Sequence, residues 1–453
     1  MGEAHRQPLA PILGETFRSG LTRPRAWRVG QLEALRCFLE EREEELAAAV
    51  SADTGKPPAE LFFTETAFLQ GEIRYALRHL GRWMRPRQAS VPLLYLPASA
   101  SWSFQPVGVV LVIGAWNYPL QLVLAPLVAA IAAGNCAVLK PSEQAPLTSA
   151  AIARGVRDYL DPRAFRVVEG GAEAARGLLA ERFDHVFFTG SRAAGREVMR
   201  AAARHPVPVT LELGGRSPCI VDSDAGLRTV ARRIAWAKFL NAGQTCIAPD
   251  YVLVRRELEG RLAAALREAV GEFYGLSPGE GGDYACVRNN ARRRRLLERF
   301  PGIAAGECLR PTLIEGAGAE AVMSEEEIFG PVLPLVAYGD IEEAIDIVQR
   351  GGEPLALYLF TSDRRVQDRV IASTRSGGVC LNDLLFQAAV PSLPFGGVGS
   401  SGFGAYHGRA GFEAFSVRRS LMQRPIAADI RLRYPPYHGL KYRFLRWLAL
   451  HFQ

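Results

Sequence analysis

A thiol and a carboxyl group, at Cys246 and Glu212, are the side chains of this sequence best suited to covalent chemistry. Cys246 follows the small, flexible run Asn-Ala-Gly-Gln-Thr, residues 241–245, whose glycine lets the backbone approach a bound molecule closely. Backbone amides at such a turn can donate hydrogen bonds to a developing oxyanion. Glu212 lies in Leu-Glu-Leu-Gly-Gly, an apolar run that ends in a glycine pair, which predicts a buried strand before a sharp turn. Apolar neighbours raise the pKa of a carboxyl group, which suits a general base that works near neutral pH.

The composition is that of a soluble globular protein with two or three domains. Of 453 residues, 48% are apolar and 22% are charged. The net charge is only +7, and the lysines and arginines are scattered along the chain, which argues against a nucleic-acid-binding protein. We interpret the densest basic run, residues 292–295, as a solvated helix face. Seven cysteines without CxxC spacing argue against a disulfide framework and against a metal site, and they favour a reducing compartment. The N-terminus does not resemble a signal peptide, so we expect a cytoplasmic protein.

The chain begins with helical sequence and then changes to alternating strands and helices. Apolar residues on a helical period predict a helix over residues 27–50 and a second over residues 59–84, and the proline- and serine-rich residues 85–105 predict a ribbon. The predicted strands that follow are residues 109–113, 136–139, 165–168 and 186–188. Strands separated by helical lengths predict parallel βαβ units in a doubly wound α/β sheet, which binds ligands at the carboxyl ends of its strands.

Three of these strands end in residues that could bind a ligand. The first is followed by Gly-Ala-Trp-Asn-Tyr-Pro at 114–119, the second by Lys-Pro-Ser-Glu at 140–143, and the fourth by Thr-Gly-Ser-Arg-Ala-Ala-Gly at 189–195. The last of these predicts a helix start whose amides face a pyrophosphate, although a plain tight turn explains it equally well. The Gly-x-Gly-x-x-Gly motif of ordinary dinucleotide folds is absent after the first strand.

Together these motifs are similar to those of the aldehyde dehydrogenase superfamily. The resemblance covers residues 12–436 and includes Glu-Glu-Ile-Phe-Gly-Pro at 326–331. Each residue also has a simpler explanation when it is taken singly. A cysteine is usually a small buried hydrophobic residue, a glutamate at a strand end is usually a surface or structural partner, and an asparagine before Tyr-Pro usually forms a turn. The resemblance implies instead that Cys246 is the nucleophile and that Glu212 activates water. It also implies that Asn117 holds the oxyanion together with the backbone amide of Cys246.

The resemblance further implies NAD as the cofactor, with NADP as the alternative. The implied cofactor-binding residues are Trp116, Lys140, Glu143, Gly190, Ser191, Gly195, Gly214, Glu327 and Phe329. Lys140 and Glu143 would bracket the adenosine ribose, Glu327 would hold the nicotinamide ribose, and Phe329 would pack beside the nicotinamide. Glu143 favours NAD because a carboxylate accepts from a free 2′-hydroxyl and repels a 2′-phosphate, whose charge Lys140 could partly offset.

The later motifs are similar to the class 3 branch of the family, whose members are dimers that act on fatty and aromatic aldehydes. These motifs are Pro-Phe-Gly-Gly at 394–397, Gly-Ala-Tyr-His-Gly at 404–408 and Arg-Tyr-Pro-Pro at 433–436. The implied architecture is a Rossmann-type dinucleotide-binding domain (1–84 and 106–210), a second α/β catalytic domain (211–415) and a small β oligomerisation element (85–105 and 416–436). Two departures are Gln387, where the branch often has histidine, and a shortened segment between residues 290 and 311, which we expect to alter a surface loop.

The implied reaction is the oxidation of a lipophilic aldehyde, such as a medium- or long-chain aliphatic one, to a carboxylic acid through a cysteine thiohemiacetal and thioester. Large apolar side chains in the segments that form the family's substrate entry favour such a substrate, although core packing is the alternative for each: Tyr118, Trp236, Phe239 and Phe386. The alternative functions are a CoA-acylating or semialdehyde dehydrogenase, a cysteine hydrolase without cofactor, and a non-catalytic binding relative. Glu212 favours water as the acyl acceptor, and the intact Cys246 favours an enzyme.

Residues 437–453 lie beyond the resemblance and form a basic amphipathic tail. After the Pro435-Pro436 turn, apolar residues recur at helical spacing among cations, and from residue 430 on there is no acidic residue. The apolar run is too short and too interrupted by charge to cross a bilayer. Two alternatives remain: a helix at a membrane surface, with its cations drawn to anionic lipid, and a tail that packs on the partner subunit of a homodimer.

Overall fold

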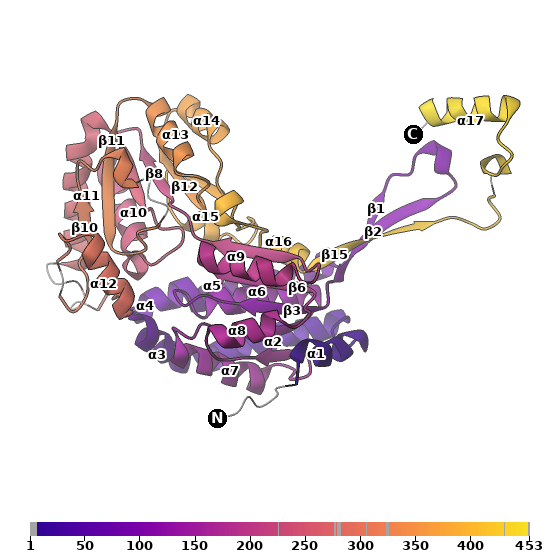
Figure 1. Cartoon of the computed structure of the whole chain (residues 1–453), viewed down its shortest axis with the longest axis horizontal. Coiled ribbons are helices and arrows are strands. Elements are labelled where there is room, and N and C mark those ends of the chain that lie inside the picture. The colour runs from indigo at the N-terminus through magenta and orange to yellow at the C-terminus, as the bar shows by residue number, and fades with distance from the viewer. Residues whose placement is uncertain are drawn as a thin grey trace.

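The protein consists of two α/β lobes and a long projecting arm (Figure 1). The structure is a computed structural model that describes residues 7–224, 226–275, 278, 282–304, 306–322, 326–429 and 431–451. The first six residues of the predicted dinucleotide-binding domain, Ile430, and residues 452–453 of the predicted tail lie outside the described residues. Each lobe contains a six-stranded sheet of mainly parallel strands, so the predicted α/β class is confirmed.

The chain begins with a helical layer in the first lobe. Its elements are α1 (Leu9–Arg18), α2 (Arg25–Glu41), α3 (Glu43–Thr54), α4 (Pro58–Leu61), the π-helical turn η1 (Phe62–Thr66) and α5 (Ala67–Trp83). The prediction of one helix over residues 27–50 is wrong, because the backbone leaves the helical region at Arg42, with φ −112° and ψ 20°. Three glutamates in the first turn of α3 interact favourably with the helix dipole and stabilise a new helix start there. The second predicted helical stretch, residues 59–84, is confirmed.

The first sheet has the strand order β14-β7-β6-β3-β4-β5. Its strands are β3 (Val109–Ile113), β4 (Cys136–Lys140), β5 (Phe165–Val167), β6 (His185–Gly190), β7 (Val209–Leu213) and the short antiparallel β14 (Gly402–Phe403). The helices between them are α6 (Gln121–Ala133), α7 (Pro146–Tyr159), α8 (Ala172–Leu179) and α9 (Arg192–Ala202). All four strands predicted from β-branched runs are present. The strand order reverses at β3, so the carboxyl ends of β3 and β6 flank the crevice in which doubly wound sheets bind ligands.

The second sheet has the order β10-β11-β9-β8-β12-β13, with every neighbouring pair parallel. Its strands are β8 (Pro218–Val221), β9 (Tyr251–Arg255), β10 (Thr312–Ile314), β11 (Val332–Tyr338), β12 (Ala356–Phe360) and β13 (Gly378–Leu381). The helices of this lobe are α10 (Leu227–Phe239), α11 (Glu259–Tyr274), α12 (Asn290–Arg299), α13 (Ile341–Arg350), α14 (Arg364–Ser373) and α15 (Phe386–Ala389). Because β7 pairs with β6, the chain changes sheets after Leu213, beyond the boundary that the sequence places at residue 210.

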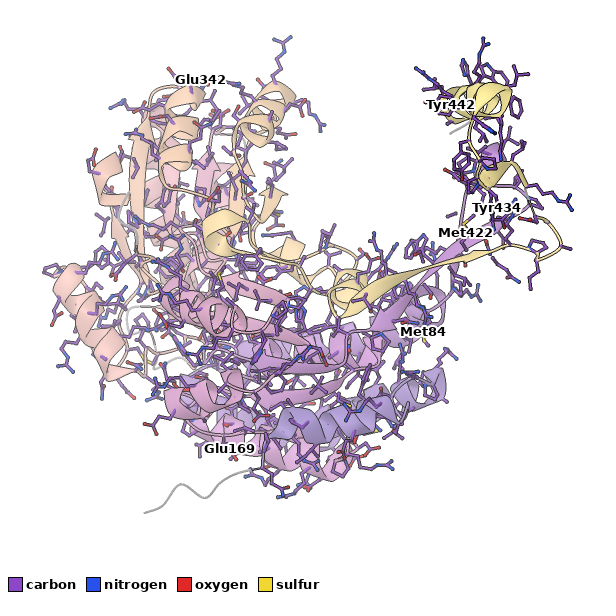
Figure 2. All side chains as sticks on the ribbon, turned by 45° about the vertical axis from the view of Figure 1, so that its right-hand side comes forward. Met84, Glu169, Glu342, Met422, Tyr434 and Tyr442 are labelled. Atoms are coloured by element: carbon purple, nitrogen blue, oxygen red, sulfur yellow. A yellow bond between two sulfur atoms is a disulfide. The ribbon has the colours of Figure 1, made fainter. Side chains whose placement is uncertain are left out.

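The arm is a three-stranded antiparallel sheet with the order β1-β2-β15. Its strands are β1 (Arg87–Ala89), β2 (Ser99–Pro106) and β15 (Ser416–Gln423), which follows α16 (Gly408–Ala414). The last helix, α17 (Gly439–His451), lies at the far end of the arm (Figure 1). Figure 2 shows Met84 at the base of the arm and Met422, Tyr434 and Tyr442 along it, away from both lobes. Residues 85–105 and 416–423 thus form one projecting ribbon, and a helix is present in the predicted tail.

One disulfide bond corrects an expectation from the sequence. Cys286 and Cys308, whose Cα atoms lie 4.9 Å apart, are joined to each other, whereas the odd number and scattered spacing of the cysteines argued against such bonds.

Among the described residues, no group of three or more histidine, cysteine, aspartate or glutamate side chains is arranged to hold a metal ion. Within the same residues, no helix has the length and apolar character needed to cross a membrane.

Candidate active site

A cavity of about 1160 Å³ between the two lobes contains most of the residues that the sequence singled out. Its walls include the carboxyl ends of β3, β4, β6 and β7 together with loops of the second lobe. The candidate residues that line it are Trp116, Asn117, Lys140, Glu143, Gly190, Ser191, Glu212, Gly214, Cys246, Glu327 and Phe329. Gly195 does not line the cavity. It is a buried residue of α9, and an added Cβ there would lie 2.7 Å from the side chain of Leu213 at the end of β7.

Cys246 is presented by a tight loop that follows α10. Three consecutive residues of this loop, Asn241, Ala242 and Gly243, have left-handed backbone conformations with φ of 51°, 52° and 74°. An added Cβ at Gly243 would overlap the carbonyl of Gly330. The two backbone segments can approach this closely only because residue 243 is a glycine. Left-handed conformations are costly for Asn241 and Ala242 and persist only where surrounding contacts hold them.

The electrostatic surroundings of Cys246 favour the thiol over the thiolate. Burial is the main cause that raises the pKa of Cys246 to about 12, and interactions with Glu327 and Glu212 act in the same direction. The backbone N–H groups of Cys246 and Ile247 act in the opposite direction. These surroundings disfavour the thiolate, so Cys246 must lose its proton before it can act as a nucleophile.

Glu212 lies in β7 with its carboxyl group inside the cavity. The residue is 3% exposed, and neither carboxyl oxygen has a hydrogen-bond partner among the described residues. Burial raises the pKa of Glu212 well above its usual value, so the raised pKa predicted from the apolar run is confirmed. A carboxyl group without partners is free to exchange a proton with a small molecule that enters the cavity.

Asn117 and Tyr118 connect the loop after β3 to the residues that precede Cys246. The Asn117 side-chain amide donates to the Gln244 carbonyl at 3.1 Å, which leaves its second N–H available. The Tyr118 hydroxyl lies 2.5 Å from the Thr245 hydroxyl. Both residues are buried, so the amide that the sequence assigned to the oxyanion is fixed beside the nucleophile loop.

The β4 and β6 ends of the cavity carry the residues assigned to the adenosine half of a dinucleotide. The Lys140 ammonium group donates to Glu143 at 2.7 Å. Burial raises the pKa of Glu143, but the hydrogen bond and charge of Lys140 outweigh it, and the net pKa is below the usual value. Ser191 is the N-cap of α9, where its hydroxyl accepts from the Ala194 N–H at 3.3 Å, as predicted for a helix start at this motif.

At the opposite end of the cavity, two aromatic rings and a cation stand beside Glu327. The Trp116 and Phe329 rings meet edge to face with centroids 5.9 Å apart, and Phe329 has a left-handed φ of 46°. The Arg292 guanidinium lies 4.1 Å from the Trp116 ring centroid and 4.9 Å from that of Phe329. The interpretation of residues 292–295 as a solvated helix face is therefore wrong for Arg292. Burial raises the pKa of Glu327 to about 8.

A family model for the Aldehyde dehydrogenase family matches residues 16–421. The chain belongs to the aldehyde dehydrogenase family. It is an oxidoreductase that acts on aldehydes, with NAD or NADP as its cofactor. The resemblance carried by the sequence motifs is thus confirmed, and so is the expectation of an enzyme.

Several relatives are named as family 3 members. Aldehyde dehydrogenase family 3 member H1 of Arabidopsis thaliana is 41% identical over 99% of this chain and 96% of its own length. Aldehyde dehydrogenase family 3 member A2 of Mus musculus is 42% identical over 97% of this chain and 93% of its own. A dimeric NADP-preferring aldehyde dehydrogenase of Canis lupus familiaris is 41% identical over 93% and 95% of the two chains.

Solved structures show the same fold. A substrate-bound AldH of Staphylococcus aureus superposes with a TM-score of 0.94, with 36% identity over 99% of this chain and 100% of that chain. An indole-3-acetaldehyde dehydrogenase of P. syringae, in complex with NAD+ and IAA, superposes with a TM-score of 0.83, with 26% identity over 92% and 88% of the two chains. The aldehyde dehydrogenase-like fold predicted from the sequence is confirmed.

The cavity of this aldehyde dehydrogenase suits a nicotinamide dinucleotide. Buried polar atoms without a described partner face it, namely the Thr189 hydroxyl and one Arg292 nitrogen, and these can bind a polar ligand. The N-terminus of α9 offers backbone amides to phosphate, and the Trp116 and Phe329 rings offer an apolar wall for a planar ring. An added Cβ at Gly214 would overlap Glu327, so the glycine leaves room for that carboxyl group.

The four aromatic residues assigned to the substrate entry divide into two pairs. Trp236 and Phe386 stack with ring centroids 5.7 Å apart and remain 37% and 55% exposed. Phe239 and Tyr118 are buried, Phe239 in the core of the second lobe and Tyr118 against Thr245. Only the first pair is therefore accessible to a molecule that approaches from solvent.

Two sets of contacts near Cys246 were not predicted from the sequence, although Gln387 itself was noted as a departure. The Gln387 amide donates to the Tyr358 hydroxyl at 3.3 Å, which in turn donates to the carbonyl of Ile247, next to the nucleophile, at 2.6 Å. Glu60 accepts from the Asn241 N–H at 2.8 Å. Burial raises the pKa of Glu60 to about 7 against the opposing charge of Lys56. No motif marks these contacts, because their partners are distant in the sequence.

Proposed function

We propose that this protein oxidises lipophilic aldehydes to carboxylic acids through a covalent intermediate on Cys246, with medium- and long-chain aliphatic aldehydes as the principal substrates. The observation that carries the proposal is that Cys246, Glu212 and Asn117 line the same cavity as the residues suited to a dinucleotide. A nucleophile, an oxyanion donor, a base and a cofactor site in one cavity are the parts that this reaction requires.

The first step in this mechanism is attack of the Cys246 thiolate on the aldehyde carbon. A carbon–sulfur bond forms, and the carbonyl electron pair moves to the oxygen. The Asn117 amide and the Cys246 backbone N–H donate to that oxygen and stabilise its charge in the thiohemiacetal. When the oxygen reforms its double bond to carbon, a hydride leaves the same carbon; NAD or NADP, when bound, would supply the acceptor for this hydride. A thioester of Cys246 is left.

The second half of the reaction releases the acid. Glu212 in its ionised form takes a proton from water, the hydroxide oxygen attacks the acyl carbon, and the carbon–sulfur bond breaks. Cys246 leaves as a thiolate, ready for the next aldehyde. The free carboxyl oxygens of Glu212 support this role, since a carboxyl group already engaged in a hydrogen bond would be a weaker acceptor for the proton.

The exposed pair Trp236 and Phe386 supports a lipophilic substrate. Each ring has apolar surface that a hydrocarbon tail would remove from water, at about 25 cal/mol per Å². An aromatic aldehyde would also stack on these rings, so we keep aromatic aldehydes as the second class. The alternative acyl acceptor is CoA, and the enclosed, unpartnered Glu212 favours water over it.

We also propose a cytoplasmic homodimer built on the arm. Residues 1–84 and 106–210 would bind the dinucleotide, 211–415 would carry the catalytic loop, and 85–105 with 416–436 would join two subunits. The edge strand β15 supports this, because Leu421 and Met422, one on each face of the strand, are 61% and 57% exposed, and its free edge can pair. The dog relative is itself named as dimeric.

For the tail, residues 437–453, we propose contact with a membrane surface, with packing on the partner subunit as the alternative.

Formation of reduced cofactor, followed by its absorbance, tests the reaction directly. The purified protein is mixed with decanal and either NAD or NADP, with and without CoA, and the product is identified by mass spectrometry. Decanoic acid formed at the same rate with and without CoA supports the proposal. Production of decanoyl-CoA would establish the CoA-acylating alternative, and absence of reduced cofactor with any aldehyde would establish a non-catalytic relative.

A further inference from the structure

A segment of the N-terminal helical layer contacts the nucleophile loop from outside the two sheets. The segment comprises the end of α3, the short α4 and the π-helical turn η1, and it contributes Lys56, Glu60 and Glu65. Lys56 and Glu65 are fully buried and form an ion pair of 2.6 Å. π-Helical turns of this kind are rare and often occur at functional sites, because the extra residue re-aims the side chains around it.

Glu60 makes the most direct contact of this segment with the loop. One of its carboxyl oxygens accepts a hydrogen bond of 2.8 Å from the Asn241 backbone N–H. Asn241 is the first of the three left-handed residues, and it is fully buried. The hydrogen bond therefore holds the loop at Asn241, whose backbone is in the left-handed region that residues other than glycine rarely adopt.

Asn241 contacts Asn117 and the backbone that precedes Cys246, the two residues that act on the aldehyde in the proposed mechanism. The Asn241 side-chain amide donates to the Asn117 carbonyl at 2.8 Å and to the Gln244 carbonyl at 3.2 Å. Asn117 donates to the same Gln244 carbonyl at 3.1 Å. One buried asparagine thus fixes the oxyanion amide relative to the backbone that immediately precedes Thr245 and Cys246.

Lys56 and Glu65 hold the neighbouring segment between β3 and α6, which contacts the nucleophile loop through Tyr118. The Lys56 ammonium lies 3.6 Å from the centroid of the Tyr118 ring, whose hydroxyl contacts Thr245. Glu65 accepts from the backbone N–H of Leu120 at 2.8 Å, at the start of α6. Because this second set of contacts fixes Tyr118 without Glu60, removal of the Glu60 carboxyl group leaves the fold in place and releases the Asn241 turn.

We propose that Glu60 is a positioning residue for the covalent step: its hydrogen bond to the Asn241 N–H sets the turn that places Cys246 and Asn117 around the aldehyde carbonyl. This inference rests on the proposed function of Cys246 and adds to it a residue that touches neither substrate nor cofactor. What the turn requires from Glu60 is an acceptor oxygen, since its partner is a neutral backbone amide. Glutamine supplies that oxygen and alanine does not.

The test compares Glu60→Ala, Glu60→Gln and the matched control Glu181→Ala. Glu181 also accepts from a single backbone N–H, that of Ala10 at 2.7 Å, but Ala10 is in α1 and not in the nucleophile loop. Turnover, the rate of the first turnover and the KM for NAD are measured with decanal below the melting transition of every variant. The melting temperature of each protein is recorded as the measure of structural damage.

We expect Glu60→Ala to lower kcat and the first-turnover rate by about 10- to 100-fold, as displacement of a reacting group by about an ångström does. Its KM for NAD should stay within about twofold of wild type, because the cofactor residues are untouched. Glu60→Gln should restore most of the activity, and Glu181→Ala should lower the melting temperature as much as Glu60→Ala does while it keeps full turnover.

Two results would overturn the inference. The first is turnover of Glu60→Ala equal to that of Glu181→Ala, and the second is a Glu60→Gln protein as slow as Glu60→Ala. A Cys246→Ala protein is measured alongside. If that variant still oxidises decanal, the covalent mechanism itself fails, whereas an inactive Cys246→Ala with a fully active Glu60→Ala overturns only the role of Glu60.

Discussion

The Lys140 ammonium donates to the Glu143 carboxylate at 2.7 Å, and the pair stands where the sequence assigned the adenosine ribose. Lys140 is 3% exposed, whereas the Glu143 side chain is 45% exposed. The ion pair keeps Glu143 ionised and leaves one of its oxygens free. A carboxylate oxygen accepts from a ribose hydroxyl and repels a phosphate at the same position, so we expect this pair to influence the choice between NAD and NADP.

We expect Glu143→Ser to shift the ratio of catalytic efficiencies toward NADP by about tenfold, since removal of the carboxylate leaves Lys140 to face a 2′-phosphate. Steady-state kinetics with both cofactors measure the ratio. Glu173→Ser, an exposed charge change on α8 that does not line the cavity, is the control for net charge. A wild-type protein that already strongly prefers NADP would show that Glu143 does not contact the ribose.

Cys246→Ala should abolish aldehyde oxidation and leave cofactor affinity within about twofold of wild type. The reason is that Cys246 supplies the only bond to the aldehyde in the proposed mechanism, whereas the residues that we expect to bind the dinucleotide lie mainly on β4, β6 and α9. Quenching of tryptophan fluorescence by NAD measures binding in the inactive variant. Oxidation at a near wild-type rate would contradict the assignment, and Cys380→Ala, another free cysteine of the second lobe, serves as the control.

Glu212→Gln should slow release of the acid more than hydride transfer. A burst of reduced cofactor in the first turnover should then appear or grow, followed by a slow steady rate, with a loss in kcat of about 10²-fold. Rapid-mixing absorbance measurements resolve the two phases. Loss of the burst together with steady turnover would mean that Glu212 acts before the thioester forms.

The pH dependence of release follows from the same residue. Burial raises the pKa of Glu212, and only its ionised form is a base, so the rate of release should rise with pH over a range above that of an ordinary carboxyl group. Glu212→Gln should lose this rise. An unchanged pH profile in the variant would assign the rise to another group.

Trp236→Ala should weaken the binding of long aldehydes more than that of short ones. With the wild type, we expect KM to fall from butanal to decanal, and the loss of the exposed ring should raise the KM for decanal by about tenfold. The KM for butanal is the internal control, because its chain offers little surface to the ring. A wild-type preference for acetaldehyde would contradict the proposed substrate class.

Removal of residues 437–453 should reduce binding to anionic vesicles. The described part of the tail forms the exposed helix α17, with Leu440 and Leu450 81% and 71% exposed and no acidic residue, so its cations and apolar side chains can both meet a lipid surface. Co-sedimentation with vesicles that contain phosphatidylserine compares the full chain with one that ends at Pro436. Equal sedimentation, together with a change in the dimer's dissociation constant, would instead assign the tail to the partner subunit.

The sequence alone determined the parallel strands of the first sheet and most of the residues of the candidate site. Strands such as β3 and β4 follow from continuous β-branched runs, because burial of both faces requires apolar side chains at every position. The turns at their carboxyl ends must bring backbone close to a ligand, so their glycines and polar residues recur in a fixed order that a short motif can carry. Cys246, Glu212 and Asn117 are found in such motifs.

Tertiary packing decided what these motifs do not encode. Glu60 and Asn241 are 181 residues apart, and Arg292 meets Trp116 only because α12 packs over the cavity. The same packing buried Phe239 and exposed Trp236, although they lie on one helix and have the same apolar character. A side chain's type limits which contacts it can make, but the partner it meets depends on how elements distant in the sequence pack together.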